Sequence, residues 1–197
     1  KILKIQALRG PNIWSVQRKK LIQMRIDLEE MEQAPTNKIE GFRERIEAMF
    51  PLMIEHRCSE GVRGGFFSRI EQGTWMGHVI EHIALEIQTL AGMETGFGRT
   101  RETKTPGVYN VVFSYTEENV GMFAAERAVA IAEALISGAA YDLEADIKQM
   151  REIREDVRLG PSTASIVEEA VSRDIPWIRL GKNSLIQLGY GVNQMRF

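Results

Sequence analysis

One run of alternating residues limits the fold of this chain more than any other feature. Between residues 20 and 28, polar residues alternate with four apolar ones, which are Ile22, Met24, Ile26 and Leu28. Because successive side chains of a β-strand point to opposite faces of the sheet, this run predicts a strand that is buried on one side only. A sheet made of such strands needs a layer of helices on its apolar face.

Helical spacing of apolar residues elsewhere supplies that layer. A helix is expected over 41–56, kinked at Pro51, and another over about 75–90, between Thr74 as a cap and Gly92. Further helices are expected over 117–136, 142–158 and 163–173. Strands are expected over 1–8, 66–70, 108–115, 175–180 and 184–188, with a loop over 96–106. No strict strand–helix–strand repeat appears, so we predict an α+β fold with a mixed or antiparallel sheet covered by helices.

Length and a change of composition divide the chain. Its 197 residues suffice for one sizeable domain and a small part of another. The character of the sequence changes at Gly160-Pro161-Ser162, so we expect one domain over 1–159 and the beginning of a second over 160–197. The chain starts at Lys1 and stops at Phe197 within a pattern, and we therefore expect a fragment of a longer protein.

Composition argues against several classes of protein. The net charge of -2 argues against nucleic-acid binding through bulk positive charge. No apolar stretch approaches the roughly 18 residues that a membrane span needs. The single cysteine, Cys58, excludes a disulfide framework and a cysteine-based zinc site within one chain. No secretory signal opens the sequence, so we expect a cytoplasmic protein without a nucleic-acid or membrane partner.

Two of the three histidines lie in His78-Val-Ile-Glu-His82, which has the pattern H-x-x-E-H. On a helix, residues i, i+3 and i+4 share one face, so His78, Glu81 and His82 should converge. Two imidazoles one turn apart are a natural zinc pair, although other divalent ions also suit them, and Glu81 could act as general base on a water molecule. The alternative is that both histidines are ordinary, partly buried residues of an amphipathic helix.

The same pattern resembles the signature of the inverzincin peptidases. A catalytic zinc takes three protein ligands, and Cys58 is a poor third candidate because it precedes a different element. In inverzincins the third ligand is a glutamate on a later helix, which implies Glu118 here, with Glu117 and Glu126 as alternatives. The 36 residues from His82 to Glu118 are fewer than inverzincins usually have.

Charged residues near glycines suggest how an anionic substrate could be held. Arg99, Arg101 and Glu102 lie in the expected loop after Gly96 and Gly98, and Arg63 precedes two further glycines. Arginines in such loops suit carboxylate binding, and a solvated polar loop is the alternative. Glu86, one turn beyond the motif, could orient His82 or be an exposed helix residue.

Longer stretches of the chain resemble the cyanophycin synthetase family. They are residues 1–12, 61–66, 73–82 and 96–103, and the tail at 159–163, 175–177 and 188–191 resembles the start of the family's ATP-grasp domain. The resemblance spans the whole chain. It implies a cytoplasmic homo-oligomer that adds aspartate and arginine to cyanophycin with ATP and magnesium. The parts that hold ATP and magnesium would lie mainly beyond Phe197.

For this chain, the resemblance implies an amino-terminal domain that handles the polymer beside the remaining synthetase domains. Together with the motif, it predicts a zinc-dependent peptidase that cuts cyanophycin and so creates primer ends, without being a competent ligase alone. The predicted polymer contacts are Arg63, Arg99, Arg101 and Glu102. The alternatives are a non-catalytic polymer-binding domain and a domain that only supports assembly of the synthetase.

Overall fold

The computed structural model describes residues 1–16, 19–181 and 184–197. It divides into two compact units, Lys1–Glu152 and Ile153–Phe197. The division falls inside helix α5 (Leu143–Asp156), ahead of the boundary expected near residue 159. Along the described residues, no helix combines the length and the apolar character that a membrane span requires.

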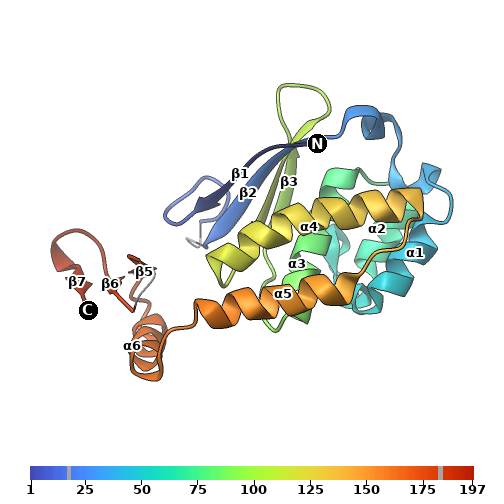
Figure 1. Ribbon diagram of the computed structural model, residues 1–197. Coiled ribbons are helices and arrows are strands. Elements are labelled where there is room, and N and C mark those ends of the chain that lie inside the picture. The colour runs from blue at the N-terminus through green and yellow to red at the C-terminus, as the bar shows by residue number, and fades with distance from the viewer. Residues whose placement is uncertain (17–18, 182–183) are drawn as a thin grey trace. The chain divides into compact units, whose positions relative to one another are not determined.

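The first unit contains a four-stranded antiparallel sheet with the order β1-β2-β4-β3 (Figure 1). Its strands are β1 (Ile2–Leu8), β2 (Leu21–Asp27), β3 (Gly98–Glu102) and β4 (Val108–Ser114). In the central pair, Met24 lies opposite Val111, and Ile22 lies opposite Phe113. All four side chains are fully buried, so the predicted strand over 20–28 is confirmed.

Helices cover one face of this sheet. Helix α3 (Met76–Leu90) packs against β3 and β4, and α4 (Glu118–Ser137) packs against β1, β2 and α3. The remaining α-helices of the unit are α1 (Phe42–Met49), α2 (Gly65–Gln72) and most of α5. Short 3-10 helices connect them, namely η1 (Glu29–Gln33), η2 (Thr36–Lys38), η3 (Pro51–Glu55) and η4 (Cys58–Glu60). The sheet and its helical layer confirm the α+β class.

Two sequence-based assignments in this unit are wrong. The strand expected over 66–70 is part of α2, because a short apolar run fits a buried helix as well as a strand. The loop expected over 96–106 contains β3, which lies at the edge of the sheet. Arg99 and Arg101 share one face of this strand and are both exposed, so the segment has no apolar alternation in its sequence. The interruption expected at Pro51 is confirmed as a split, because α1 ends at Met49 and the separate 3-10 helix η3 begins at Pro51.

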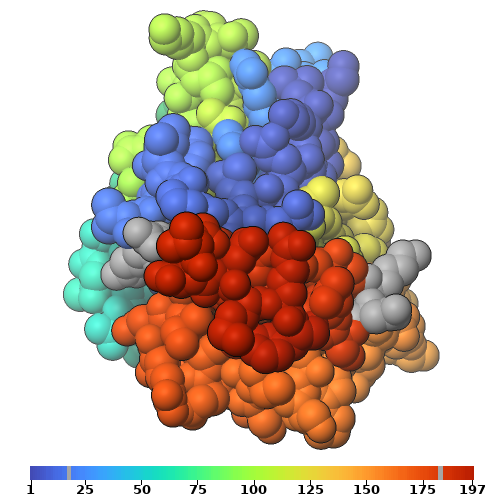
Figure 2. Space-filling model, turned by 90° about the vertical axis from the view of Figure 1, so that its left-hand side faces the viewer, coloured from blue at the N-terminus to red at the C-terminus, as the bar shows by residue number. Residues whose placement is uncertain are grey.

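The second unit consists of α6 (Pro161–Ser172) and a small antiparallel sheet with the order β5-β6-β7. Its strands are β5 (Trp177–Arg179), β6 (Ile186–Leu188) and β7 (Met195–Arg196), with η5 (Gly191–Asn193) before β7. Figure 2 shows the last residues of the chain, in red, as an exposed surface, and Val192, Met195 and Phe197 are exposed apolar residues there. Val167, Ala170 and Ile186 are the buried apolar residues among the described part of this unit.

Candidate functional site

A cavity of about 950 Å³ opens in the first unit beside the amino-terminal half of α3. Its lining includes His78, Glu81 and His82 from α3. Cys58 lines it from η4, and Thr100 lines it from β3. The three residues of the H-x-x-E-H pattern therefore share one face of a helix and one cavity.

Cys58, His78 and His82 form a group of potential metal ligands, whose donor atoms all lie within 4.8 Å of one another. Cys58 Sγ is 3.1 Å from His78 Nε2, while His78 Nδ1 is 3.1 Å from the hydroxyl of Thr74. Burial lowers the pKa of His78 to about 4 and the pKa of His82 well below its usual range. Both imidazoles are therefore neutral near pH 7 and have a lone pair to offer.

A buried carboxylate fixes the orientation of His82 through the third histidine. His82 Nδ1 is 2.9 Å from His56 Nδ1, and His56 Nε2 is 2.8 Å from Oε2 of Glu86. The Glu86 carboxylate accepts the Nε2–H of His56, so His56 Nδ1 accepts the Nδ1–H of His82. This order of donors leaves Nε2 of His82 unprotonated, which is the form that binds a metal.

Sequence reasoning offered an exposed position for Glu86 as one alternative, but its side chain is buried, with 2% of its surface exposed. It acts on His82 through His56, a residue that the sequence analysis did not single out. The available signal was the rarity of histidine, since all three histidines of the chain meet at this cavity.

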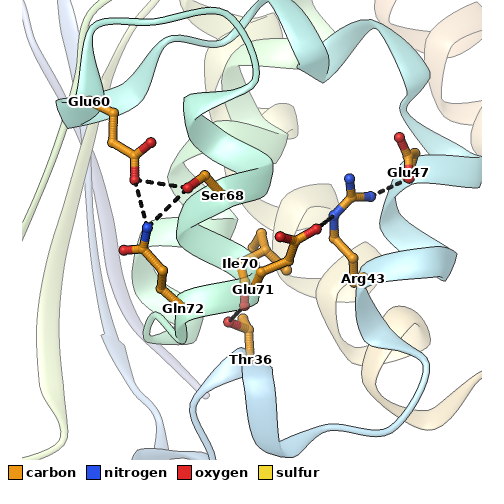
Figure 3. A network of polar contacts seen from close by, with 8 residues as sticks. All are labelled: Thr36, Arg43, Glu47, Glu60, Ser68, Ile70, Glu71 and Gln72. Carbon is orange, nitrogen blue, oxygen red and sulfur yellow. Dashed lines mark hydrogen bonds and ion pairs between the residues drawn. The ribbon is translucent and has the colours of Figure 1, made fainter.

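Tertiary packing brings Cys58 to the histidines, although Cys58 lies in η4 and the histidine pair of the motif lies in α3. Glu60, at the end of η4, accepts hydrogen bonds from Ser68 Oγ and Gln72 Nε2 of α2, each 3.1 Å long (Figure 3). A Cβ atom at Gly65 would lie 2.1 Å from the carbonyl oxygen of Arg57, so only glycine allows η4 to approach α2 this closely. The exclusion of a cysteine as metal ligand is thus not supported by the geometry.

The same close-up shows a second polar contact group on α2 and α1. Arg43 pairs with Glu47 and Glu71, and the Thr36 hydroxyl donates to the Ile70 carbonyl oxygen (Figure 3). These contacts fasten α2 to α1 and η2. Helix α2 can therefore serve as a fixed support for η4, the element that carries Cys58.

Glu81 lies in an environment that favours its protonated form. Its side chain is buried, with 6% of the residue exposed, and Oε2 accepts a hydrogen bond of 2.6 Å from the Thr100 hydroxyl. Burial raises the pKa of Glu81 to about 7, against the opposing effects of Thr100 and Arg99. A Cβ atom at Gly98 would lie 2.3 Å from Glu81 Oε1, so the carboxylate occupies space that a larger residue in β3 would fill.

The structure does not bring Glu118 to this cavity. Arg9 Nε donates a hydrogen bond of 2.6 Å to Glu118 Oε2, and the Tyr115 hydroxyl donates one of 3.2 Å to the same oxygen. The hydrogen bond from Arg9 lowers the pKa of Glu118. Within the described residues, neither Glu118 nor the alternatives Glu117 and Glu126 line the cavity. Cys58, and not Glu118, thus lies with His78 and His82 in the group of potential metal ligands.

Only two of the four residues predicted to contact substrate belong to the described lining of the cavity. Arg99 and Arg101 line the cavity, whereas Arg63 and Glu102 are absent from its lining as the described residues define it. Arg63 Nε instead donates a hydrogen bond of 2.8 Å to Glu55, and both side chains are exposed. Arg69 lines the cavity as well, although the sequence analysis did not single it out.

Residues 23–137 match the family described as "Cyanophycin synthase-like N-terminal domain". The chain belongs to this family. It is 52% identical to the cyanophycin synthetase of Geminocystis herdmanii, 51% to that of a Synechocystis species and 49% to that of Crocosphaera subtropica. Each alignment covers all of this chain and 23% of the relative. The chain thus spans about a quarter of the length of these relatives, and the family match includes every residue of the cavity.

Proposed function

We propose that this domain is a metal-dependent peptidase that cleaves cyanophycin within a cyanophycin synthetase. The observation that carries the proposal is the group of three donor atoms within 4.8 Å, beside a buried carboxylate whose pKa is about 7. The relatives are named cyanophycin synthetases, which supports the choice of polymer. In this proposal, cleavage shortens the polymer and creates new chain ends that the synthetase can extend.

Zinc is the metal that fits these donors. Two neutral imidazoles and one thiolate are common zinc ligands, and three protein ligands leave one position open, as in catalytic zinc sites. The residues that would hold it are Cys58, His78 and His82. When bound, the metal supplies a Lewis acid that makes water more acidic and polarises a carbonyl group.

Glu81 is the proposed general base and acid. With a pKa of about 7, its carboxylate is partly unprotonated near neutral pH and can accept a proton from water. The oxygen of that water forms a bond to the amide carbon, the C–N bond breaks, and the proton passes from Glu81 to the leaving nitrogen. Thr100 holds the carboxylate at one oxygen during this exchange.

Strand β3 offers a place for an extended polymer. It is one of the two edge strands of the sheet and lines the cavity, so its outer backbone groups can pair with another extended chain. Arg99 and Arg101 are exposed on this strand and are proposed carboxylate contacts. We further propose that residues 160–197 begin the ATP-grasp domain of a homo-oligomeric, cytoplasmic ligase whose ATP and magnesium sites lie outside this chain.

The test is hydrolysis of cyanophycin by the purified 197-residue chain, with metal content measured on the same samples. Glu81→Gln should reduce cleavage by about a thousandfold, within the range for loss of a general base and acid, while zinc content stays unchanged. Glu118→Gln, a matched change outside the cavity, should leave cleavage within about threefold of the parent, since solvated surface pairs contribute little.

Cleavage by Glu81→Gln at the parent rate would refute the peptidase mechanism. If the parent chain binds the polymer and never cleaves it, with or without a chelator, the domain is a non-catalytic polymer-binding module. That second function is favoured by the arginines at the cavity, which need no metal to hold carboxylates. Absence of both binding and cleavage would leave assembly of the synthetase as its role.

A further inference from the structure

Arg69 of α2 carries a charge that the proposed hydrolysis does not use. Among the described residues its guanidinium has no hydrogen-bond or ion-pair partner, and its Nε atom is shielded from solvent. The residue is half-buried and lines the cavity. A charge removed from water without a counter-charge is unfavourable, so an anion from outside the chain would stabilise this side chain.

The position of Arg69 places that anion beside the candidate metal ligands. Phe66, one turn earlier on α2, packs its ring against His82 and His78, with ring centroids 4.5 and 6.0 Å apart. Residues i and i+3 lie on the same face of a helix, so Arg69 is directed toward the same cavity. Arg69 and His78 both line this cavity.

The cavity as a whole is richer in positive than in negative charge. Its charged lining residues are Arg57, Arg69, Arg99, Arg101, Glu55 and Glu81. Four arginines thus lie in the lining with two glutamates, and Glu55 is already paired with Arg63. The whole chain has a net charge of -2, so this positive excess is a local property of the cavity.

We propose that Arg69 binds a carboxylate of the substrate next to the candidate metal ligands, so that the cavity selects peptides with carboxylate-bearing residues near the bond that is cut. The planar guanidinium can hold a carboxylate through two parallel hydrogen bonds. This assignment rests on the proposed function for the step that follows binding, but the binding itself requires no metal. A phosphate group offers similar oxygens, and the experiment separates the two.

The first experiment measures binding of a short poly-aspartate peptide to the chelator-treated chain. Isothermal calorimetry gives the affinity, and Trp75, which lines the cavity, provides a fluorescence signal. Arg69→Met should weaken binding by about tenfold or more, because hydrogen bonds to charged groups contribute about 1.5–3 kcal/mol. Arg69→Lys should fall between the parent and Arg69→Met, since lysine keeps the charge and loses the paired geometry.

Arg25→Met is the matched control. Arg25 is exposed in β2 and absent from the described cavity lining, so its loss should change the affinity by less than about twofold. Circular dichroism and thermal unfolding establish that each variant is folded. Equal affinities for the parent and Arg69→Met would overturn the inference, as would failure of the parent to bind poly-aspartate.

Two further measurements separate the possible failures. Inorganic phosphate and succinate compete with the peptide at equal concentration, and stronger competition by phosphate would overturn the carboxylate assignment. In cleavage assays on zinc-loaded protein, Arg69→Met should raise KM more than it lowers kcat, with unchanged zinc content. If the parent never cleaves while Arg69→Met still weakens peptide binding, the proposed hydrolysis fails and the carboxylate site stands.

Discussion

Two glutamates that the sequence assigned to one metal site occupy opposite electrostatic environments. Glu81, in the cavity beside α3, is buried, and burial raises its pKa to about 7. Glu118, at the start of α4, is partly exposed and paired with Arg9, whose hydrogen bond lowers its pKa. The first environment keeps a proton available for exchange, and the second keeps a permanent charge.

The comparison shows that each region uses its carboxylate for a different purpose. Arg9 and Glu118 are 109 residues apart in the sequence, so their contact fastens the end of β1 to the start of α4. Tyr115 donates a further hydrogen bond to the same carboxylate. Among the described residues Glu81 forms no ion pair, and the hydrogen bond from the Thr100 hydroxyl holds its carboxyl group against β3. The Glu118 carboxylate thus links two segments that are distant in the sequence, whereas the Glu81 carboxyl lies in the cavity beside the candidate metal ligands.

The largest expected effect concerns the pH dependence of folding. Between pH 4.5 and 7, the folded chain retains the Glu81 proton that the unfolded chain has released, so stability falls as pH rises through this window. The full loss is about 3 kcal/mol at 1.36 kcal/mol per pKa unit. Urea unfolding of the chelator-treated parent and Glu81→Gln should therefore give stability differences that change by most of this amount between pH 5 and pH 8.

Glu118→Gln sharpens that test because the contribution of Glu118 to stability changes with pH in the opposite direction. The lowered pKa of Glu118 means that its contribution is present above the unfolded pKa and is lost as pH falls through the folded value. The parent and this variant should therefore differ equally at pH 5 and pH 8 and converge only at lower pH. A pH-independent difference between the parent and Glu81→Gln would show that Glu81 is not protonated as described.

A smaller effect is expected for the metal ligands. Cys58→Ser should weaken zinc binding by at least about 100-fold, because loss of groups that only orient a ligand already costs about 10–100-fold. Glu118→Gln should leave zinc affinity unchanged, because Arg9 and Tyr115 hold Glu118 in another environment. Competition with a coloured chelator measures the affinity, and cobalt substitution reports the thiolate through its charge-transfer absorption. Loss of zinc in Glu118→Gln alone would instead assign the third position to Glu118.

The smallest effect is expected for the carboxylate behind His56. Glu86→Gln should weaken zinc binding by about tenfold, the lower end for a group beyond the ligands, because an amide can donate to His56 Nε2 and reverse the order of donors. Glu126→Gln, on the exposed side of α4, is the matched control and should have no effect. Equal zinc affinities for Glu86→Gln and the control would show that His82 is oriented without the Glu86–His56 pair.

The sequence predicted those parts of the molecule that depend on local periodicity. The alternating run forms β2. The segment with helical spacing around the H-x-x-E-H pattern forms α3, which places His78, Glu81 and His82 on one face. Both follow from the fixed geometry of strands and helices. The helix and strand expected over 117–136 and 108–115 are also confirmed as α4 and β4.

The rest of the site depends on contacts between segments that no periodicity encodes. Cys58 reaches His78 because η4 is fastened to α2, and His56 reaches both His82 and Glu86 across the cavity. The partner of Glu118 could not be foreseen either, since Arg9 lies at the end of β1. In each case the side chain was visible in the sequence, but its neighbour was set by tertiary packing.

Two glycines described above help to distinguish related sequences that can form this candidate site from those that cannot. Space for the Glu81 carboxylate exists because position 98 has no side chain, and η4 reaches α2 because position 65 has none. A relative that keeps H-x-x-E-H but has a larger residue at either place should have lost the geometry while retaining the pattern. Genome surveys for this candidate site should therefore search for the two glycines together with the histidines, since the pattern alone would include copies that cannot form it.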